Sequence, residues 1–146
     1  NNDELLRTLN MGMNHNTAKI LLWKYENHLI QCGKAGYKVL RYDDIEQPHL
    51  EHIAPQTENK EPNNGYCSYD EDFYNRYLEC LGNYLLLSGS HNISLSNERF
   101  QKKRESYTYL RQQREVLGMT EKDLIWDKDK IHLRHSKIVD YLIQTL

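Results

Sequence analysis

The chain has 146 residues, of which 38% are hydrophobic and 27% charged, and its formal net charge is −2. This length suits a single domain with its own hydrophobic core, and this composition excludes an intrinsically disordered chain. No apolar run approaches the roughly 20 residues that a membrane-spanning helix needs, and the polar first residues lack the basic start of a secretory signal, so we expect neither feature.

The first predicted element is a long helix. Asn16 or Thr17 can cap its start, and apolar residues with helical spacing continue to about Gln31. Gly33 and Gly36 are suited to end it, because glycine tolerates the backbone angles found just beyond a helix.

Two extended segments and a loop are predicted next. Residues 37–41 predict a strand, and residues 49–53 predict a second extended segment that enters a turn at Pro55. Residues 58–69 combine Asn, Gly, Pro and charge with little apolar surface to bury, which indicates a loop.

The second half of the chain predicts helices around one buried strand. Residues 72–81 predict a helix, and residues 83–88 predict a buried strand because this short apolar run is bounded by glycines. Residues 97–113 predict the next helix, with apolar positions near one face. Thr120 can cap a short helix, and Asp127 can start the last one.

Helix, strand, loop, helix, strand and further helices, in this order, predict a mostly helical α+β domain. We expect residues 1–146 to form one domain, with residues 1–16 as a linker or truncated element. Because the chain does not begin with methionine, we also expect it to be a fragment of a longer protein.

The chain has three cysteines, Cys32, Cys67 and Cys80. An odd number without a CxxC pair favours reduced thiols in a cytoplasm over a disulfide framework. Cys67 and Cys80 could instead join His49 or His52 in a zinc site, although structural zinc ligands usually occur in closely spaced pairs.

Charge is distributed unevenly along the chain. Residues 43–72 contain nine acidic residues against Lys60 alone, whereas residues 99–114 contain six basic residues against Glu105 alone. An acidic segment followed by a basic helix would suit a metal site beside a phosphate-binding surface. Two solvated faces of opposite sign would give the same pattern, so charge alone does not decide.

Three short segments carry residues suited to phosphodiester chemistry. They are Leu50-Glu51-His52-Ile53-Ala54-Pro55-Gln56, then Leu81-Gly82-Asn83-Tyr84-Leu85-Leu86-Leu87-Ser88, and then His91-Asn92. Hydrolysis of a phosphodiester needs a base that deprotonates water and a cation that stabilises the developing charge. Histidine suits the base near neutral pH, and carboxylate and amide oxygens suit Mg²⁺.

In this order, the segments resemble the HNH nuclease motif, which has an acidic residue before His-Ile-x-Pro, then Asn-x-x-x-Leu, then Asn at a helix start. The longer pattern is similar to the C-terminal nuclease domain of GmrSD-type modification-dependent restriction endonucleases. It is carried by Leu81-Gly82-Asn83, Leu85-Leu86-Leu87-Ser88-Gly89, Asn92, Leu95-Ser96-Asn97, Phe100, Lys103-Arg104, Tyr107, Trp126, Ile131 and Arg134. The resemblance runs from about residue 17 to the end of the chain, and it implies a ββα-metal (HNH) core with flanking helices.

By this resemblance, His52 is the general base, and Glu51 and Asn92 hold one divalent cation, expected to be Mg²⁺ with Mn²⁺ as a substitute. Asn83 braces the loop that carries His52, through hydrogen bonds from its side chain to the backbone. Glu51 departs from the aspartate that is common at this position, which leaves the metal preference open. Taken singly, His52 could be a structural histidine, Asn83 a turn residue and Asn92 a helix cap.

Lys102, Lys103 and Arg104 are candidates for phosphate contacts beside the metal, which would make binding salt-dependent. A charged surface helix would carry the same residues without binding DNA. His91 is a rival metal ligand because it neighbours Asn92, but adjacent side chains at a helix start point in different directions.

The resemblance implies a divalent-metal-dependent endonuclease domain that nicks or cuts DNA, as the effector of a bacterial anti-phage restriction protein. In such proteins an N-terminal nucleotide-hydrolysing domain senses the modification, so we expect that domain as a partner, in the bacterial cytoplasm and without membrane attachment. The expectation leaves room for a homo-oligomer. The alternatives are a non-catalytic DNA-binding or scaffolding module that kept the fold, and an RNase or toxin of the same fold.

Overall fold

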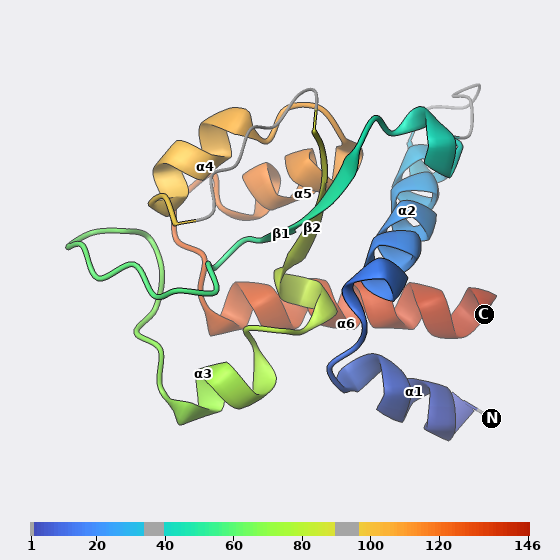
Figure 1. Ribbon diagram of the computed structural model, residues 1–146, viewed down its shortest axis with the longest axis horizontal. Coiled ribbons are helices and arrows are strands. Elements are labelled where there is room, and N and C mark those ends of the chain that lie inside the picture. The colour runs from blue at the N-terminus through green and yellow to red at the C-terminus, as the bar shows by residue number, and fades with distance from the viewer. Residues whose placement is uncertain (1, 34–39, 90–96) are drawn as a thin grey trace.

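The computed structural model describes residues 2–33, 40–89 and 97–146, which form a mostly helical α+β domain with a two-stranded sheet. Its elements are α1 (Asn2–Asn10), α2 (His15–Cys32), the 3₁₀ turn η1 (Tyr42–Asp44), β1 (Pro48–His52), α3 (Glu71–Arg76), the 3₁₀ turn η2 (Leu81–Asn83), β2 (Tyr84–Ser88), α4 (Phe100–Ser106), α5 (Arg111–Met119) and α6 (Lys128–Thr145). Figure 1 shows the strands in the middle, with α4 to their upper left, α2 to the right and α6 below. Within these residues, no helix is both long and apolar enough to cross a membrane.

The two strands are antiparallel, with Glu51 opposite Leu85 and His52 opposite Tyr84. Successive side chains of a strand point to opposite faces of the sheet, and directly opposite residues share a face. Glu51 and His52 are therefore neighbours in sequence but face different sides of the sheet.

Two hydrophobic cores meet at β2, all of whose residues are buried. Tyr84 and Leu86 belong to the core that packs against α1, α2 and most of α6. Leu85 and Leu87 belong to the core formed with α3, α4, α5 and Trp126. A strand covered on both faces needs an uninterrupted apolar sequence, which explains the run that predicted it.

The structure confirms the elements predicted at residues 16–31, 49–53, 58–69 and 83–88, together with the last helix. Asp127 caps that last helix, α6, by accepting a hydrogen bond from the Lys130 backbone. Asn14, rather than Asn16 or Thr17, caps α2, because its side chain accepts a hydrogen bond from the Asn16 backbone.

The single helix predicted over residues 97–113 is wrong, because α4 ends at Ser106 and α5 begins at Arg111. Tyr107 and Leu110 would lie on one face of a continuous helix, since they are three residues apart. In the structure, Tyr107 packs in the core around Trp126, whereas Leu110 packs in the core around α2. The interruption lets one segment serve both cores.

Two other predicted helix boundaries are also wrong. The helix predicted over 72–81 ends at Arg76, and the chain then turns so that the Leu78 carbonyl accepts a hydrogen bond from the Asn83 side chain. Thr120 ends α5 instead of starting a helix, and its hydroxyl donates to the Val116 carbonyl at 2.8 Å.

The N-terminal region, expected to be a linker or truncated element, contains a helix. Residues 2–10 form α1, and Leu9 is buried in the core beside α6. Most of the strand predicted at 37–41 lies outside the described residues, and Leu40 and Arg41 are not in a strand. The Leu40 backbone instead exchanges two hydrogen bonds with the side chain of Asn27 on α2.

Candidate active site at the end of the sheet

A buried asparagine holds the turn that follows β1. The Asn83 side-chain oxygen accepts hydrogen bonds from the Ala54 backbone at 2.9 Å and from the Trp126 indole at 3.0 Å. Its nitrogen donates to the carbonyls of Ala54 and Leu78, both at 3.0 Å. All four hydrogen-bonding positions of the amide are therefore used, which fixes the backbone just beyond His52.

The segment that carries Asn83 packs closely against α6. A Cβ on Gly82 would collide with the Ile131 carbonyl and with His135, so the approach of the two segments requires glycine. Arg134 adds a hydrogen bond to the Gly82 carbonyl at 3.0 Å. The Leu-Gly-Asn sequence thus joins the sheet to α6 and positions the asparagine.

His52 is the last residue of β1, and its ring lies edge-on to Tyr84 with the centroids 5.1 Å apart. Its Nε2 lies 2.8 and 2.6 Å from the two carboxylate oxygens of Glu79. A neutral histidine that donates from Nε2 has its lone pair on Nδ1. The pair is therefore suited to accept a proton at Nδ1.

The surroundings of His52 favour its neutral form. Burial lowers the pKa of His52 below its ordinary value, and the neighbouring His15 and Lys103 lower it further, while Glu79 opposes the shift. A histidine that stays neutral near pH 7 has a lone pair available for a proton.

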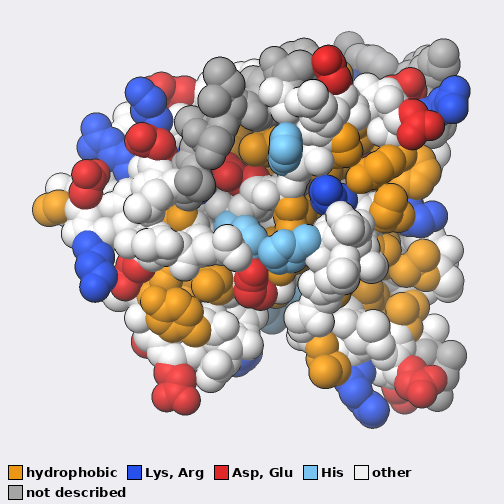
Figure 2. Space-filling model, viewed as in Figure 1, with side chains coloured by type: hydrophobic (Ala, Val, Ile, Leu, Met, Phe, Trp, Pro, Cys, Tyr) orange, Lys and Arg blue, Asp and Glu red, His pale blue; other side chains and the backbone are white. Residues whose placement is uncertain are grey.

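His15, the first residue of α2, completes a cluster of three groups that we call the His15–His52–Glu79 cluster. Its Nε2 lies 3.6 Å from a Glu79 oxygen, and its ring centroid lies 5.5 Å from that of His52. One ligand atom from each residue lies within 4.8 Å of the others. Figure 2 shows histidine side chains beside an acidic side chain near the middle of this face.

Among the described residues, His15, His52 and Glu79 form the group of three histidine, cysteine or acidic side chains that lie close enough together to hold a metal ion. Neither Cys67 nor Cys80 belongs to it. The structure therefore gives no support to the alternative of a cysteine-containing zinc site.

Glu51 lies on the opposite face of the sheet, in closed surroundings. Its side chain is 5% exposed and lies 3.6 Å from the Lys103 ammonium. The Tyr107 hydroxyl donates to the other carboxylate oxygen at 2.7 Å. Burial raises the pKa of Glu51, while Lys103 and Tyr107 oppose the rise. Both carboxylate oxygens therefore face groups of the protein itself.

Lys103 does not meet the expectation of a phosphate contact, because it is fully buried. Its ammonium donates to the carbonyls of His52 at 2.9 Å and Ile53 at 3.1 Å, and so ties α4 to the end of β1. Arg104 joins α4 to the end of α5 through the Thr120 hydroxyl and a carbonyl. Lys102 is exposed, so it keeps the predicted surface position.

Asn92, the second expected metal ligand, lies outside the described residues, as does its rival His91. Among the predicted site residues, the structure places Asn83 against the turn that follows His52, and it places the Glu51 side chain on the opposite face of the sheet from that of His52. The role of each remains a proposal.

Sequence reasoning missed Glu79 and His15. Glu79 could have been noticed, because it is the one acidic residue between Asp72 and Glu98 and it lies four positions before Asn83. His15 carried no such signal, since it is distant from His52 in the sequence and only the packing of α2 on the strands brings the two together.

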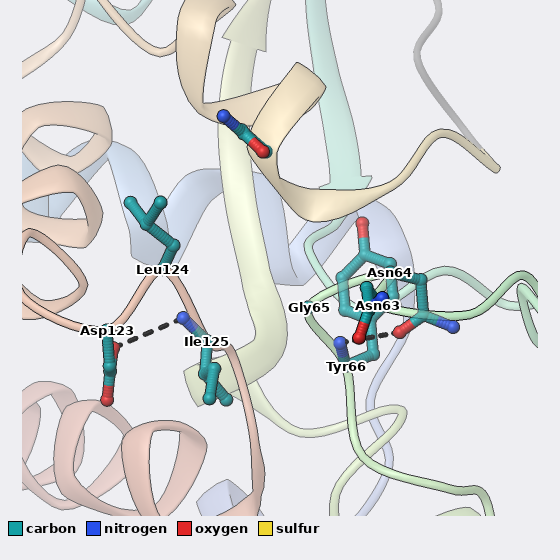
Figure 3. A pocket seen from close by; sticks show the side chains of 8 residues that line it. Asn63, Asn64, Gly65, Tyr66, Asp123, Leu124 and Ile125 are labelled. Atoms are coloured by element: carbon teal, nitrogen blue, oxygen red, sulfur yellow. Dashed lines mark hydrogen bonds between the residues drawn. The ribbon is translucent and has the colours of Figure 1, made fainter.

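A separate cavity of about 480 Å³ shares no residue with the His15–His52–Glu79 cluster. Figure 3 shows it between the turn at residues 63–66 and the segment at residues 123–125, with Asn64 bonded to the Tyr66 backbone and Asp123 to the Ile125 backbone. Its lining offers one carboxylate and no histidine, so it is a poorer candidate for hydrolytic chemistry.

Comparison with known proteins identifies a family. The family model described as GmrSD restriction endonucleases, C-terminal domain, matches residues 3–141. No curated protein matches the chain. The matched region contains the sheet, η2 and all three members of the His15–His52–Glu79 cluster.

Proposed function

The chain belongs to the family of GmrSD restriction endonuclease C-terminal domains, and on this basis we propose that it hydrolyses DNA phosphodiester bonds with the help of a divalent cation. The observation that carries the proposal is the pairing of His52 with Glu79 at the end of β1. A histidine held by a carboxylate is a common arrangement for activating a nucleophile, here water.

In the proposed reaction, His52 takes a proton from water at Nδ1 while Glu79 holds Nε2. The water oxygen forms a bond to phosphorus as the bond from phosphorus to the leaving oxygen breaks, and the leaving oxygen takes up a proton from solvent. The Glu79 carboxylate stabilises the positive charge that the ring acquires. Burial supports this role, because it keeps His52 neutral before the reaction begins.

Asn83 acts as a positioning residue in this proposal, because it touches the turn after His52 and not the reacting groups. A base must be held within a fraction of an ångström of its working position to be effective. The four hydrogen bonds of Asn83, one of them from the buried Trp126, supply this rigidity.

The family suggests a divalent cation, which would supply positive charge beside the phosphate when bound. Asn92 remains a proposed ligand from the resemblance. Glu51 does not fit a ligand's role in this arrangement, because Lys103 and Tyr107 occupy its oxygens and its side chain is almost fully enclosed. No step of the proposed reaction therefore depends on a cation at Glu51.

We place this activity in a larger bacterial protein, as the effector of anti-phage restriction. In the proposed assembly, an N-terminal nucleotide-hydrolysing domain senses modified DNA and controls the nuclease. Lys102 is the proposed phosphate contact that remains on the surface. Self-association would allow two such sites to cut both strands.

Cleavage of supercoiled plasmid tests the proposal. The purified chain is incubated with plasmid in Mg²⁺, in Mn²⁺ and in EDTA, with a structured RNA of similar length in parallel. We expect nicked or linear plasmid with a divalent cation and intact plasmid with EDTA. An identically purified His52→Ala variant controls for contaminating nuclease, and His49→Ala, which changes an exposed histidine of the same strand, is the matched control.

Each outcome selects one function. Intact plasmid with both cations would favour the non-catalytic module, provided that the chain is folded. Preferential cleavage of RNA would favour the RNase or toxin. Equal cleavage by wild type and His52→Ala would show that His52 takes no part in the reaction.

A further inference from the structure

The His15–His52–Glu79 cluster joins three distant parts of the chain at one point. His15 begins α2, His52 ends β1, and Glu79 lies between α3 and η2. Both imidazole rings pack edge-on against Tyr84, with centroid distances of 5.8 Å for His15 and 5.1 Å for His52. One buried aromatic ring thus supports both histidines.

The cluster is open to solvent on one side. The side chains of His15 and Glu79 are 51% and 37% exposed, whereas that of His52 is 9% exposed. An ion that approaches from solvent meets the two exposed groups first and finds the His52 ring beneath them. Figure 2 shows this gathering of histidine and acidic side chains on the surface.

Two imidazole nitrogens and one carboxylate are a ligand set for Zn²⁺ and similar transition-metal ions, whereas Mg²⁺ prefers oxygen ligands. Ligand atoms about 2.1 Å from a tetrahedral ion lie about 3.4 Å from one another. The Glu79 oxygens lie 2.6 and 2.8 Å from His52 Nε2, and one of them lies 3.6 Å from His15 Nε2. All three ligand atoms lie within 4.8 Å of one another, so side-chain movements would admit an ion, and water would complete its coordination.

We propose that His15, His52 and Glu79 bind one transition-metal ion of the Zn²⁺ class, and that this ion inhibits the nuclease. The inhibition rests on the proposed function of His52. When Nε2 of a neutral imidazole binds a metal, the ring hydrogen resides on Nδ1, so neither nitrogen is left to accept a proton from water. The ion also removes the Glu79 carboxylate from its partnership with His52.

Direct metal binding tests the site without any nuclease assay. The metal-free chain competes for Zn²⁺ with a chromophoric chelator, and the same titration is run on His15→Ala, Glu79→Ala and His132→Ala. We expect one ion per wild-type chain and at least tenfold weaker binding by His15→Ala and Glu79→Ala. His132→Ala, which removes an exposed histidine of α6, should bind as wild type does.

His15 is exposed, so its replacement should leave the chain folded, which circular dichroism checks. Absence of Zn²⁺ binding by wild type would overturn the site. Equal binding by wild type and His15→Ala would overturn the assigned ligands.

Inhibition is measured separately, as the ratio of each protein's DNA cleavage rate with and without one equivalent of Zn²⁺ in excess Mg²⁺. This ratio cancels any effect of a variant on its own basal rate. We expect at least a tenfold decrease for wild type and a ratio near one for His15→Ala. A higher rate with Zn²⁺ would overturn the inhibition, whereas a chain that never cleaves DNA would refute the proposed function and leave the Zn²⁺ titration to decide the metal site.

Discussion

Glu51 and His52 are neighbours on β1, yet their side chains lie on opposite faces of the sheet, in enclosed surroundings for Glu51 and in a cluster open to solvent for His52. Glu51 is enclosed with Lys103 and Tyr107 in the core around Trp126. His52 is the buried member of the His15–His52–Glu79 cluster, and the side chains of Glu79 and His15 are partly exposed to solvent. One strand thus separates a buried ion pair from the histidine that we propose as the general base.

The difference shows that adjacent residues of a motif can lie on opposite faces of a sheet. A sequence places both residues at one site, but strand alternation sends consecutive side chains to opposite faces. Lys103 contacts both sides, because its ammonium approaches Glu51 and also donates to the His52 carbonyl. Lys103 therefore links the Glu51 carboxylate to the backbone of His52. The variants below separate the contribution of Glu51 and Lys103 from that of His52 and Glu79.

The largest effect on stability is expected from Lys103→Met. It leaves Glu51 buried without its cation and leaves the carbonyls of His52 and Ile53 without their donor. Loss of one partner of a buried ion pair costs about 3 to 5 kcal/mol. Urea denaturation measures the change in the free energy of unfolding.

Lys102→Met is the matched control, because Lys102 is the exposed neighbour on the same helix, and we expect a change within about 0.5 kcal/mol. The double variant Glu51→Gln with Lys103→Met should lose less stability than the two single variants added together, since neither partner is left alone. Equal effects of Lys102→Met and Lys103→Met would show that the enclosed pair does not hold the fold.

Asn83→Ala should destabilise both sides of the sheet by about 2 to 4 kcal/mol, because buried donors on Ala54 and Trp126 lose their acceptor. Urea denaturation followed by tryptophan fluorescence measures this loss. Asn75→Ala, an exposed asparagine of α3, is the control and should have little effect. A wild-type stability for Asn83→Ala would contradict the bracing role.

Glu79→Gln should affect chemistry more than stability. The replacement removes the carboxylate charge that supports His52, and we expect about tenfold slower DNA cleavage, equivalent to about 1.4 kcal/mol of transition-state stabilisation. Because Glu79 is partly exposed, the free energy of unfolding should change by less than about 1 kcal/mol. Glu71→Gln, on the exposed surface of α3, serves as the control. An unchanged cleavage rate would show that Glu79 does not assist His52 as the general base.

The smallest effect is expected in the titration of His52 itself. Burial lowers the pKa of His52 and Glu79 opposes this shift, so Glu79→Gln should lower the pKa further. Because the pKa of His52 is lower in the folded state than in the unfolded chain, the unfolded chain binds a proton at His52 more readily. The folded state therefore loses stability as the pH falls below the usual histidine range.

Nuclear magnetic resonance of the chelator-treated protein follows the His52 ring directly, with the spectrum of His52→Ala identifying its signal. A pKa above the ordinary histidine value in wild type would contradict the described surroundings of His52. So would a rise of this pKa in Glu79→Gln.

Local sequence patterns predicted the parts of the fold that depend on local rules. The buried run of β2 and the Asp127 cap of α6 are examples, because burial on both faces and capping leave clear local signals. The break between α4 and α5 was missed, since it depends on Tyr107 and Leu110 packing in different cores. No local pattern reports which core a residue enters.

The candidate site divides in the same way. His52 and Asn83 could be selected from the sequence, and the fold brings them together across the turn at Ala54. The burial of Lys103 and the approach of His15 depend on how α4 and α2 pack against the strands, so neither could be foreseen.

The central claim, that His52 serves chemistry whereas Glu51 serves the fold, is tested most directly by measuring DNA cleavage and unfolding on the same sample of His52→Ala. We predict a cleavage rate about 100 to 10,000 times lower than that of wild type, the usual contribution of a general base, with the chain still folded cooperatively. His49→Ala, assayed beside it, should cleave as wild type does. A folded His52→Ala protein that cleaves DNA at the wild-type rate would contradict the claim.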